Sequence, residues 1–300
     1  MLSVDKITEV FCKVDDFCIP FYENLKTRQL TQAPVKRYRK PRMSDSEIIT
    51  IAILFHLGGF RNMKHFYLNY VCKHLQSEFP NTLSYNRFVE RLQSSILPMG
   101  IFLKTCCLGK CTGISFIDST PIRVCHTKRE YIHKTFKGIA QKGQCSIGWF
   151  FGFKLHIIIN DKGEILDFML TPGNTDDRKP LESKNIISKL YGKLFGDKGY
   201  ISKSLFENLF IDGIHLVTKI RKNMKNSLML MADKIALRKR SLIETVNDEL
   251  KNICQIEHTR HRSFENMITN LFAGLIAYSF LDKKPSINCF QTSENGLIIS

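Results

Sequence analysis

The pattern of hydrophobic and polar positions changes near residue 113. Before that point, apolar residues recur at helical spacing or run almost without interruption between cap and turn residues, which predicts an all-helical region. After it, short apolar runs separated by glycine-containing turns alternate with segments of helical period. This alternation predicts an α/β fold, a mixed sheet flanked by helices. We therefore expect a helical region at 1–108, an α/β domain at 109–282 and a loose tail at 283–300.

One helix of the N-terminal region is predicted to be buried, at 44–60. Ser44 is a good N-cap, and Glu47 follows three residues later, the spacing of a capping box. The apolar positions that follow are nearly continuous up to Gly58, so the helix presents no polar face to water. Two further helices are predicted, an amphipathic one at 61–75 and another after a turn near residue 80.

Short helices joined by tight turns resemble a helix-turn-helix bundle. The last helix of such a bundle enters a DNA groove, and here it would carry Arg87 and Arg91. The alternative is an ordinary helical cap on the domain that follows. Five basic side chains crowd into 36–42, either as a flexible arm on phosphates or as a solvated charge run.

The α/β domain is predicted to contain strands and helices in the order β, ββ, α, β, α, β, α. A buried strand at 113–118 precedes an antiparallel hairpin, whose strands at 148–160 and 164–174 flank a glycine-containing turn. The remaining segments are a helix at 178–192, a strand at 193–200, a helix at 202–213, a strand at 214–220, a long helix at 233–255 and a helix at 266–281 that we expect on the sheet.

The charge balance indicates a nucleic-acid partner. The chain has 44 Lys and Arg against 28 Asp and Glu, a net charge of +16, and such a surface attracts phosphate backbones through counterion release. Solubility or membrane-surface binding is the alternative explanation.

Apolar runs fall short of the roughly 20 residues of a membrane span, and no signal peptide opens the chain, so we expect a cytoplasmic protein. The ten cysteines contain no C-x-x-C pair, which predicts free thiols rather than a zinc site.

Two aspartates follow apolar runs that we predict to be strands. Asp118 ends the first run, and Asp197 lies between Gly196 and Gly199, which allow close backbone approach to a bulky substrate. The carboxyl ends of neighbouring strands meet at one edge of an α/β sheet, so the two carboxylates would lie side by side. Magnesium prefers oxygen ligands of this kind. A plain turn is the alternative explanation for Asp197.

A third acid is selected by its position on the predicted helix at 233–255. At about 100° per residue, with Arg240 at zero, Glu244 falls at about 40° and Lys251 at about 20°, in one narrow stripe. Glu249 falls at about 180° and Asp248 at the margin, at about 80°. The core face is predicted to hold Ile243, Val246, Leu250 and Ile253. Glu244 is thus the acid flanked by cations on its own face, unless the helix is a surface helix with paired charges.

Taken together, these segments make the chain similar to the DDE transposases of bacterial insertion sequences. The resemblance covers most of the chain and rests on IDSTPI (117–122), GFKLH (152–156), TPGNTDDR (171–178), GDKGY (196–200), the R-x3-E-x6-K helix and SYNRF (84–88). It implies an RNase H-like core in which Asp118, Asp197 and Glu244 bind two Mg²⁺ ions, for which Mn²⁺ can substitute. These carboxylates would then catalyse strand cleavage and strand transfer.

The resemblance also assigns basic residues. Arg240 and Lys251 match the basic positions of the Y-R-E-K signature, while the tyrosine position is occupied by Leu237, a departure that bears on the branch of the family. His156 and Lys154 share one face of a predicted strand, and we expect His156 to be structural. Further DNA contacts are expected from Arg123, Lys128, Arg129, Lys198, Arg87 and Arg91.

The resemblance implies two in-line phosphoryl transfers. A metal-activated water would cut the element end and free a 3′-hydroxyl, which would then attack target DNA. The implied partners are double-stranded DNA, as terminal inverted repeats and target, and a second copy of the chain in a homodimer at the nucleoid. The alternatives are a stand-alone nuclease of the same fold and a non-catalytic DNA-binding derivative. A structural or interaction protein would leave the three acids unexplained.

Overall fold

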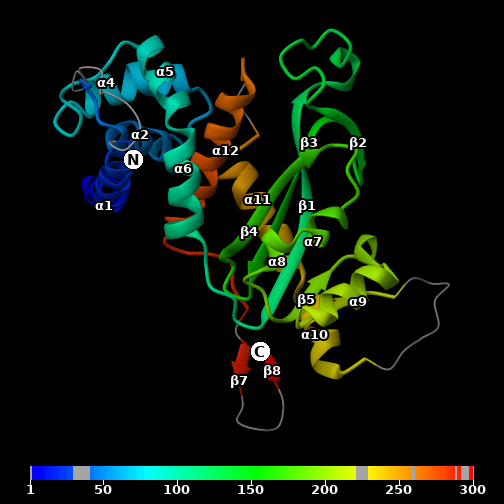
Figure 1. The fold of residues 1–300 in the computed structure, drawn as a ribbon. Helices are drawn as coiled ribbons and strands as arrows, with labels where there is room; N and C mark the ends of the chain where they lie inside the picture. Colours follow the sequence, from blue (N-terminus) through cyan, green and yellow to red (C-terminus); the bar gives the residue numbers. More distant parts are fainter. Residues whose placement is uncertain are drawn as a thin grey trace. The chain divides into compact units, whose positions relative to one another are not determined.

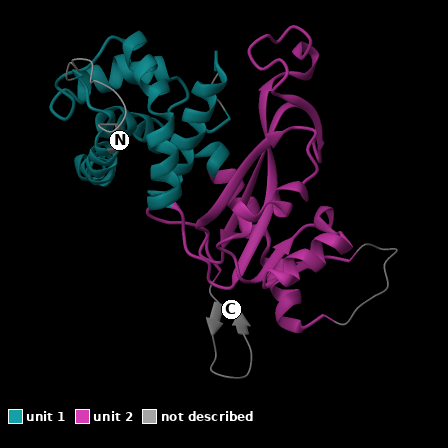
Figure 2. Ribbon diagram, in the orientation of Figure 1, with its two compact units in different colours: residues 1–107, 250–281 teal, residues 108–249, 282–300 magenta. Residues whose placement is uncertain are grey.

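The computed structural model describes residues 2–29, 41–220, 229–257, 261–287, 289–291 and 297–299. The chain divides into two compact units, residues 1–107 with 250–281 and residues 108–249 with 282–300 (Figure 2). Most of the basic run at 36–42 lies outside the described residues. Across the described segments, no helix has both the length and the apolar character that crossing a membrane requires.

The first unit is helical, as the hydrophobic pattern predicts. It differs from the predicted region 1–108 because it also takes in residues 250–281. Its elements are α1 (Val4–Gln29), α2 (Asp45–Leu57), α3 (Met63–His65), the π-helical η1 (Phe66–Val71), α4 (Cys72–His74), α5 (Tyr85–Ser94), α6 (Ile96–Phe102), the π-helical η2 (Leu103–Cys107) and α12 (Phe264–Ser279).

Helix α2 is the centre of this unit and has the predicted cap. The Ser44 backbone N–H donates to Glu47 Oε2 at 2.6 Å, and the Glu47 N–H donates back to Ser44 Oγ at 3.1 Å. Every residue from Ile48 to His56 is buried. Helix α12, which we expected on the sheet, packs within this unit against α2, α5 and α6. Gly274 of α12 allows the segment after α11 to approach this helix closely, because a Cβ there would meet the Ile256 side chain at 2.4 Å.

The second unit contains the sheet (Figure 1). Its strands are β1 (Ile114–Cys125), β2 (Gln141–Cys145), β3 (Gly148–Asn160), β4 (Ile165–Pro172), β5 (Gly192–Gly196) and β6 (Ile214–Thr218). Its helices are the 3-10 turns η3 (Thr127–Arg129) and η4 (Lys198–Tyr200), then α7 (Lys179–Glu182), α8 (Lys184–Ile187), α9 (Lys203–Ile211), α10 (Met231–Lys239) and most of α11 (Ser241–Asn252). Within the segment predicted as a loose tail, β7 (Cys289–Gln291) and β8 (Leu297–Ile299) pair antiparallel.

The sheet is mixed, which confirms the predicted α/β class. Its order is β2-β3-β1-β5-β6, with β4 paired to β3. Strand β1 runs antiparallel to β3 and parallel to β5, and β5 runs parallel to β6. The predicted hairpin is confirmed as β3 and β4, whereas β2 is an additional strand that the pattern did not reveal.

Two predicted helices are interrupted. The segment at 178–192 forms α7 and α8, separated at Ser183, and the long helix at 233–255 forms α10 and α11, separated at Arg240. On α11, the predicted core residues Val246 and Leu250 are fully buried. Ile253 is 44% exposed, so its assignment to the core face is wrong, because α11 ends at Asn252 and the chain leaves the helical path before it.

Side chains alternate across β1 and so separate the core from the site. Ile117 belongs to an apolar cluster with residues of α7, α8 and α9, including Leu181, Ile186 and Leu205. Its neighbours Phe116 and Asp118 therefore face the opposite side of the sheet. Asp118 is in this way directed away from this apolar cluster and toward the side on which α11 contacts it.

Candidate active site

Asp118 and Asp197 occupy equivalent positions on two neighbouring parallel strands. Phe116 of β1 is in register with Phe195 of β5, and each aspartate lies two residues further along the chain, Asp118 within β1 and Asp197 directly after β5. Strand β1 does not end at Asp118, as the apolar run suggested, because β3 pairs with it as far as Cys125. It is β5 that ends, at Gly196, and this opens the sheet beside Asp118.

The Asp118 carboxyl group is the most buried of the three acids. Its side chain is 24% exposed, and burial raises its pKa to about 6. The charge of Arg240 acts in the opposite direction, while the charges of Glu244 and Asp197 add to the rise in pKa. The pKa of Asp118 therefore responds to both other acids, which places Glu244 and Asp197 each within electrostatic reach of Asp118. Asp197 is exposed, and the Glu244 side chain is 57% exposed.

Arg240 connects two of the acids from the break between α10 and α11. Its Nη2 lies 2.6 Å from Glu244 Oε1, and its Nη1 lies 3.7 Å from Asp118 Oδ1. The Arg240 side chain is only 15% exposed. Lys251, the other cation of the predicted stripe, belongs to the helical unit and pairs with Glu257 at 3.3 Å. Arg240 is therefore engaged with Asp118 and Glu244.

Asn247 is a site residue that the sequence reasoning missed. Its Nδ2 donates to Asp118 Oδ2 at 3.0 Å, and the residue is buried. Its Oδ1 is buried as well and meets no hydrogen-bond donor among the described residues. The signal was available, because Asn247 falls at about 340° on the same helical projection, next to the stripe of Arg240 and Glu244.

A fourth carboxylate, Asp177, is connected to the site through Ser119, which follows Asp118. Asp177 Oδ1 accepts a hydrogen bond from Ser119 Oγ at 2.8 Å and lies 2.9 Å from Lys154 Nζ. Ser119 directly follows Asp118, so this network borders the acid cluster. His156 is buried with its Nε2 at 2.8 Å from Thr171 Oγ1, and burial lowers its pKa to about 4. This is the structural histidine that we expected.

The basic residues predicted to contact DNA in the sheet unit lie at its surface. Arg123 is exposed near the end of β1, and Lys128 and Arg129 are exposed in η3. Lys198 is exposed and directly follows Asp197. Their exposure is compatible with phosphate contact, and this role stays a prediction.

The two arginines predicted to enter a DNA groove both lie on α5 of the helical unit. The Arg87 side chain is 73% exposed and pairs with Glu90 at 2.7 Å. The Arg91 side chain is 30% exposed and lies 2.6 Å from Asp45, the first residue of α2. Arg91 therefore also links two helices, and the groove contact of both residues stays a prediction.

The donor set of the acid cluster suits a hard divalent cation, although no complete ligand cage is formed. Within the described ranges, no group of three His, Cys, Asp or Glu side chains is close enough to hold a metal ion. All candidate donors are oxygens, as Mg²⁺ prefers. The buried Asn247 Oδ1 and Tyr200 hydroxyl have no hydrogen-bond partner in the described part of the chain, so each has capacity for a further contact. The residues present therefore fit such an ion chemically.

We expect Asn247→Ala to lower activity by about 10- to 100-fold, the usual effect of removing a group that orients a metal-holding carboxylate. The variant loses the only side-chain amide that donates to Asp118 among the described residues. Enzyme kinetics at several metal concentrations would show a raised metal requirement. Thr245→Ala is the matched control, because Thr245 is exposed on the same helix and its hydroxyl donates to the Ser241 carbonyl. Equal losses in both variants would contradict the positioning role.

Comparison with known proteins places this geometry in a family. The sequence pattern described as "Transposase DDE domain" matches residues 108–264, more than half of the chain, including all three acids and Asn247. The match and the strand order together confirm the RNase H-like fold class. No curated protein matches the chain.

Two solved structures show a distant likeness. One is described as "Cryo-EM structure of piggyBac transposase synaptic complex with hairpin DNA", with a TM-score of 0.45, 10% identity, and coverage of 90% of this chain and 70% of that one. The other is described as "Crystal structure of the Mos1 Strand Transfer Complex", with a TM-score of 0.23, 13% identity, and coverage of 67% of this chain and 65% of that one.

Proposed function

The chain belongs to the protein family described as "Transposase DDE domain", and from this premise we propose that it cuts DNA at the ends of a bacterial insertion sequence and joins those ends to target DNA. The observation that carries the proposal is the cluster around Asp118. One arginine, Arg240, faces both Asp118 and Glu244, and the pKa of Asp118 responds to Glu244 and Asp197. The substrates would be double-stranded DNA at the terminal inverted repeats and at the target.

Three carboxylates would hold the metal. Asp118, Asp197 and Glu244 are the ligands we propose for two Mg²⁺ ions, or Mn²⁺ in their place, with the Asn247 amide nitrogen donating to Asp118. When bound, such ions stabilise the attacking and leaving oxygens of an in-line displacement at phosphorus.

The residues around the carboxylates prepare them for this task. Arg240 holds Asp118 and Glu244 by opposite charge, which counters the repulsion between them. Because burial raises the pKa of Asp118 to about 6, this carboxyl group is largely ionised only above that pH. Lys198, next to Asp197, would hold a phosphate of the strand near the acids.

Both steps exchange one phosphorus–oxygen bond for another. In cleavage, a water oxygen bonds to phosphorus while the bond to the 3′-oxygen breaks, and that oxygen leaves with a proton. In joining, the freed 3′-hydroxyl attacks a target phosphate and displaces the neighbouring 3′-oxygen of the target strand. No protein nucleophile is needed. Ser119 Oγ donates to Asp177, and burial raises the pKa of the Tyr200 hydroxyl well above its usual value.

Cleavage of DNA that carries the element ends tests the proposal. We expect the full chain with Mg²⁺ or Mn²⁺ to nick duplexes that contain the inverted repeats flanking its gene and to join them to a second duplex. Asp197→Ala should abolish both steps while DNA binding persists. Asp212→Ala is the matched control, because Asp212 is an exposed aspartate after α9.

Three outcomes would overturn the proposal. Undiminished cutting by Asp197→Ala would exclude the acid cluster as the site. Equal cutting of random duplexes without joining would indicate a stand-alone nuclease, and binding without cutting would indicate a non-catalytic derivative. We also expect a homodimer on DNA at the nucleoid, because two element ends need two sets of carboxylates, and the mass of the complex with DNA measures this.

A further inference from the structure

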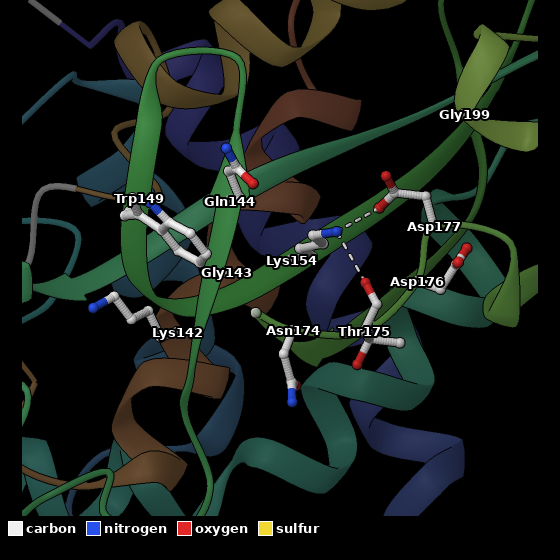
Figure 3. Close-up of a pocket in the computed structure, with 11 residues that line it drawn as sticks. Lys142, Gly143, Gln144, Trp149, Lys154, Asn174, Thr175, Asp176, Asp177 and Gly199 are labelled. Carbon is white, nitrogen blue, oxygen red and sulfur yellow. Dashed lines mark hydrogen bonds and ion pairs between the residues drawn. The ribbon is translucent and has the colours of Figure 1, made fainter.

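A second group of residues forms an open pocket at the border of the acid cluster (Figure 3). The pocket has a volume of about 420 Å³ and lies between the β2–β3 hairpin, the loop after β4 and Gly199. This volume is within the range of about 300–1,000 Å³ that is typical of small-molecule sites. Its side chains include an indole, two lysines and two amides, supplied by Trp149, Lys142, Lys154, Gln144 and Asn174.

Trp149 is the most informative residue of this pocket. It is the single tryptophan of the chain, and it is 60% exposed at the start of β3 rather than buried in the core. Lys142 Nζ lies over the ring, 5.5 Å from its centre. Proteins bind single-stranded nucleic acid with exposed aromatic rings, on which bases stack, and with cations that hold the phosphates.

The other polar groups of the pocket are compatible with a nucleotide. Gln144 and Asn174 are exposed amides, which offer both donors and acceptors to a base edge. The acidic lining is already compensated, because Asp177 pairs with Lys154 at 2.9 Å and Asp176 pairs with Arg178 at 2.5 Å. Lys142 has a more distant partner, Glu130, at 3.5 Å. Its ammonium group is therefore the cation of the pocket best placed to bind a phosphate.

Glycines fix the floor of the pocket. A Cβ at Gly143 of β2 would lie 2.0 Å from the Gly173 carbonyl oxygen, so only glycine allows the hairpin and the loop after β4 to meet there. The backbone around Trp149 is thus held by the sheet rather than by a long loop. A preformed floor reduces the ordering that a bound ligand would require.

We infer that this pocket binds one unpaired nucleotide of the DNA strand that the acids process, with its base on Trp149 and its phosphate on Lys142. The strand can reach both places, because Gly199 of the pocket is two residues from Asp197 and Asp177 is bonded to Ser119 beside Asp118. A base inside a duplex has both faces covered by its neighbours, so the base that stacks here is one outside a duplex. The inference rests on the proposed function for the source of that strand.

The fluorescence of the single tryptophan reports directly on this pocket. The full chain is titrated without divalent metal, so that no cutting occurs, with a single-stranded oligothymidylate of about 10 nucleotides, a typical site size for one single-strand binding domain. We expect saturable quenching of Trp149 emission. With a labelled strand, Trp149→Ala should bind about 5- to 150-fold more weakly, and Trp149→Phe should restore most of the affinity.

Matched variants and probes separate base binding from general charge attraction. Phe210→Ala removes an aromatic ring that is 64% exposed on α9 and should leave affinity unchanged. Lys142→Gln should weaken binding and reduce its dependence on salt. Equal quenching by an abasic strand or by inorganic phosphate would overturn the inference, and so would unchanged affinity of Trp149→Ala. Metal-dependent cutting is measured separately. If the pocket does not bind a nucleotide, quenching fails while cutting persists; if the proposed function is wrong, cutting fails while quenching persists.

Discussion

An Asp118→Asn variant is expected to be inactive and, without metal, more stable than the native protein. Burial raises the pKa of the folded-state carboxyl group to about 6, against about 3.9 in an unfolded chain. Below pH 3.9 both states hold the proton, and between these values only the folded state keeps it, so stability falls as the pH rises. Above pH 6 the ionised group lowers the free energy of unfolding by something on the order of 3 kcal/mol. An uncharged asparagine removes that penalty and can still accept the hydrogen bond from Asn247.

Thermal unfolding with and without metal measures both halves of this expectation. At pH 7.5, about 1.5 units above the pKa of Asp118, the carboxyl group is ionised. In a chelating buffer at this pH, the melting temperature of Asp118→Asn should exceed that of the native chain. Near pH 4 the difference should vanish. Added Mg²⁺ or Mn²⁺ should stabilise the native chain and not the variant, because metal binding to the folded state adds to stability. Asp212→Asn, an exposed aspartate, should behave as the native chain. Equal stabilisation of both proteins by metal would remove Asp118 from the metal site.

The two aspartates could be paired from the sequence because strand patterning is a local signal. Each aspartate directly follows a short apolar run, and the register of β1 with β5, in which Phe116 pairs with Phe195, places Asp118 level with Asp197. The length of β1 could not be predicted in this way. Its second half is polar and contains Pro121, and it becomes a strand because β3 pairs with it. That pairing joins residues far apart in the sequence.

The surroundings of Glu244, the acid on a helix, could be predicted from the sequence only in part. The angular projection correctly put Arg240 beside Glu244, since four residues make about one turn. It treated 233–255 as one helix, however, and could not show the break at Arg240 that turns this side chain toward Asp118. Leu237, which stands at the tyrosine position of the Y-R-E-K signature that the sequence resembles, is buried, and a leucine is compatible with that core position.

Arg240→Gln is expected to move the pH dependence of activity to higher pH. The guanidinium charge lowers the pKa of Asp118, against the effects of burial, Glu244 and Asp197. Without that charge the pKa rises above about 6, so a smaller fraction of Asp118 is ionised at neutral pH. Each pKa unit reduces the ionised fraction about tenfold at pH values below the pKa. We therefore expect kcat/KM below pH 6 to fall by about tenfold for each unit by which the pKa rises, with a smaller loss near pH 7 and recovery at alkaline pH.

The pH profile distinguishes this positioning role from the direct DNA contact that the family signature suggests for Arg240. A phosphate contact would be lost with weaker DNA binding and a smaller dependence of affinity on salt, while the acid limb of the profile would stay where it was. Arg240→Lys keeps a charge near both acids and should restore the native profile more than the native affinity. Arg238→Gln, an exposed arginine two residues earlier on α10, removes the same net charge away from the acids. If Arg238→Gln shifted the acid limb as far as Arg240→Gln, the shift would arise from overall charge and not from the contact with Asp118.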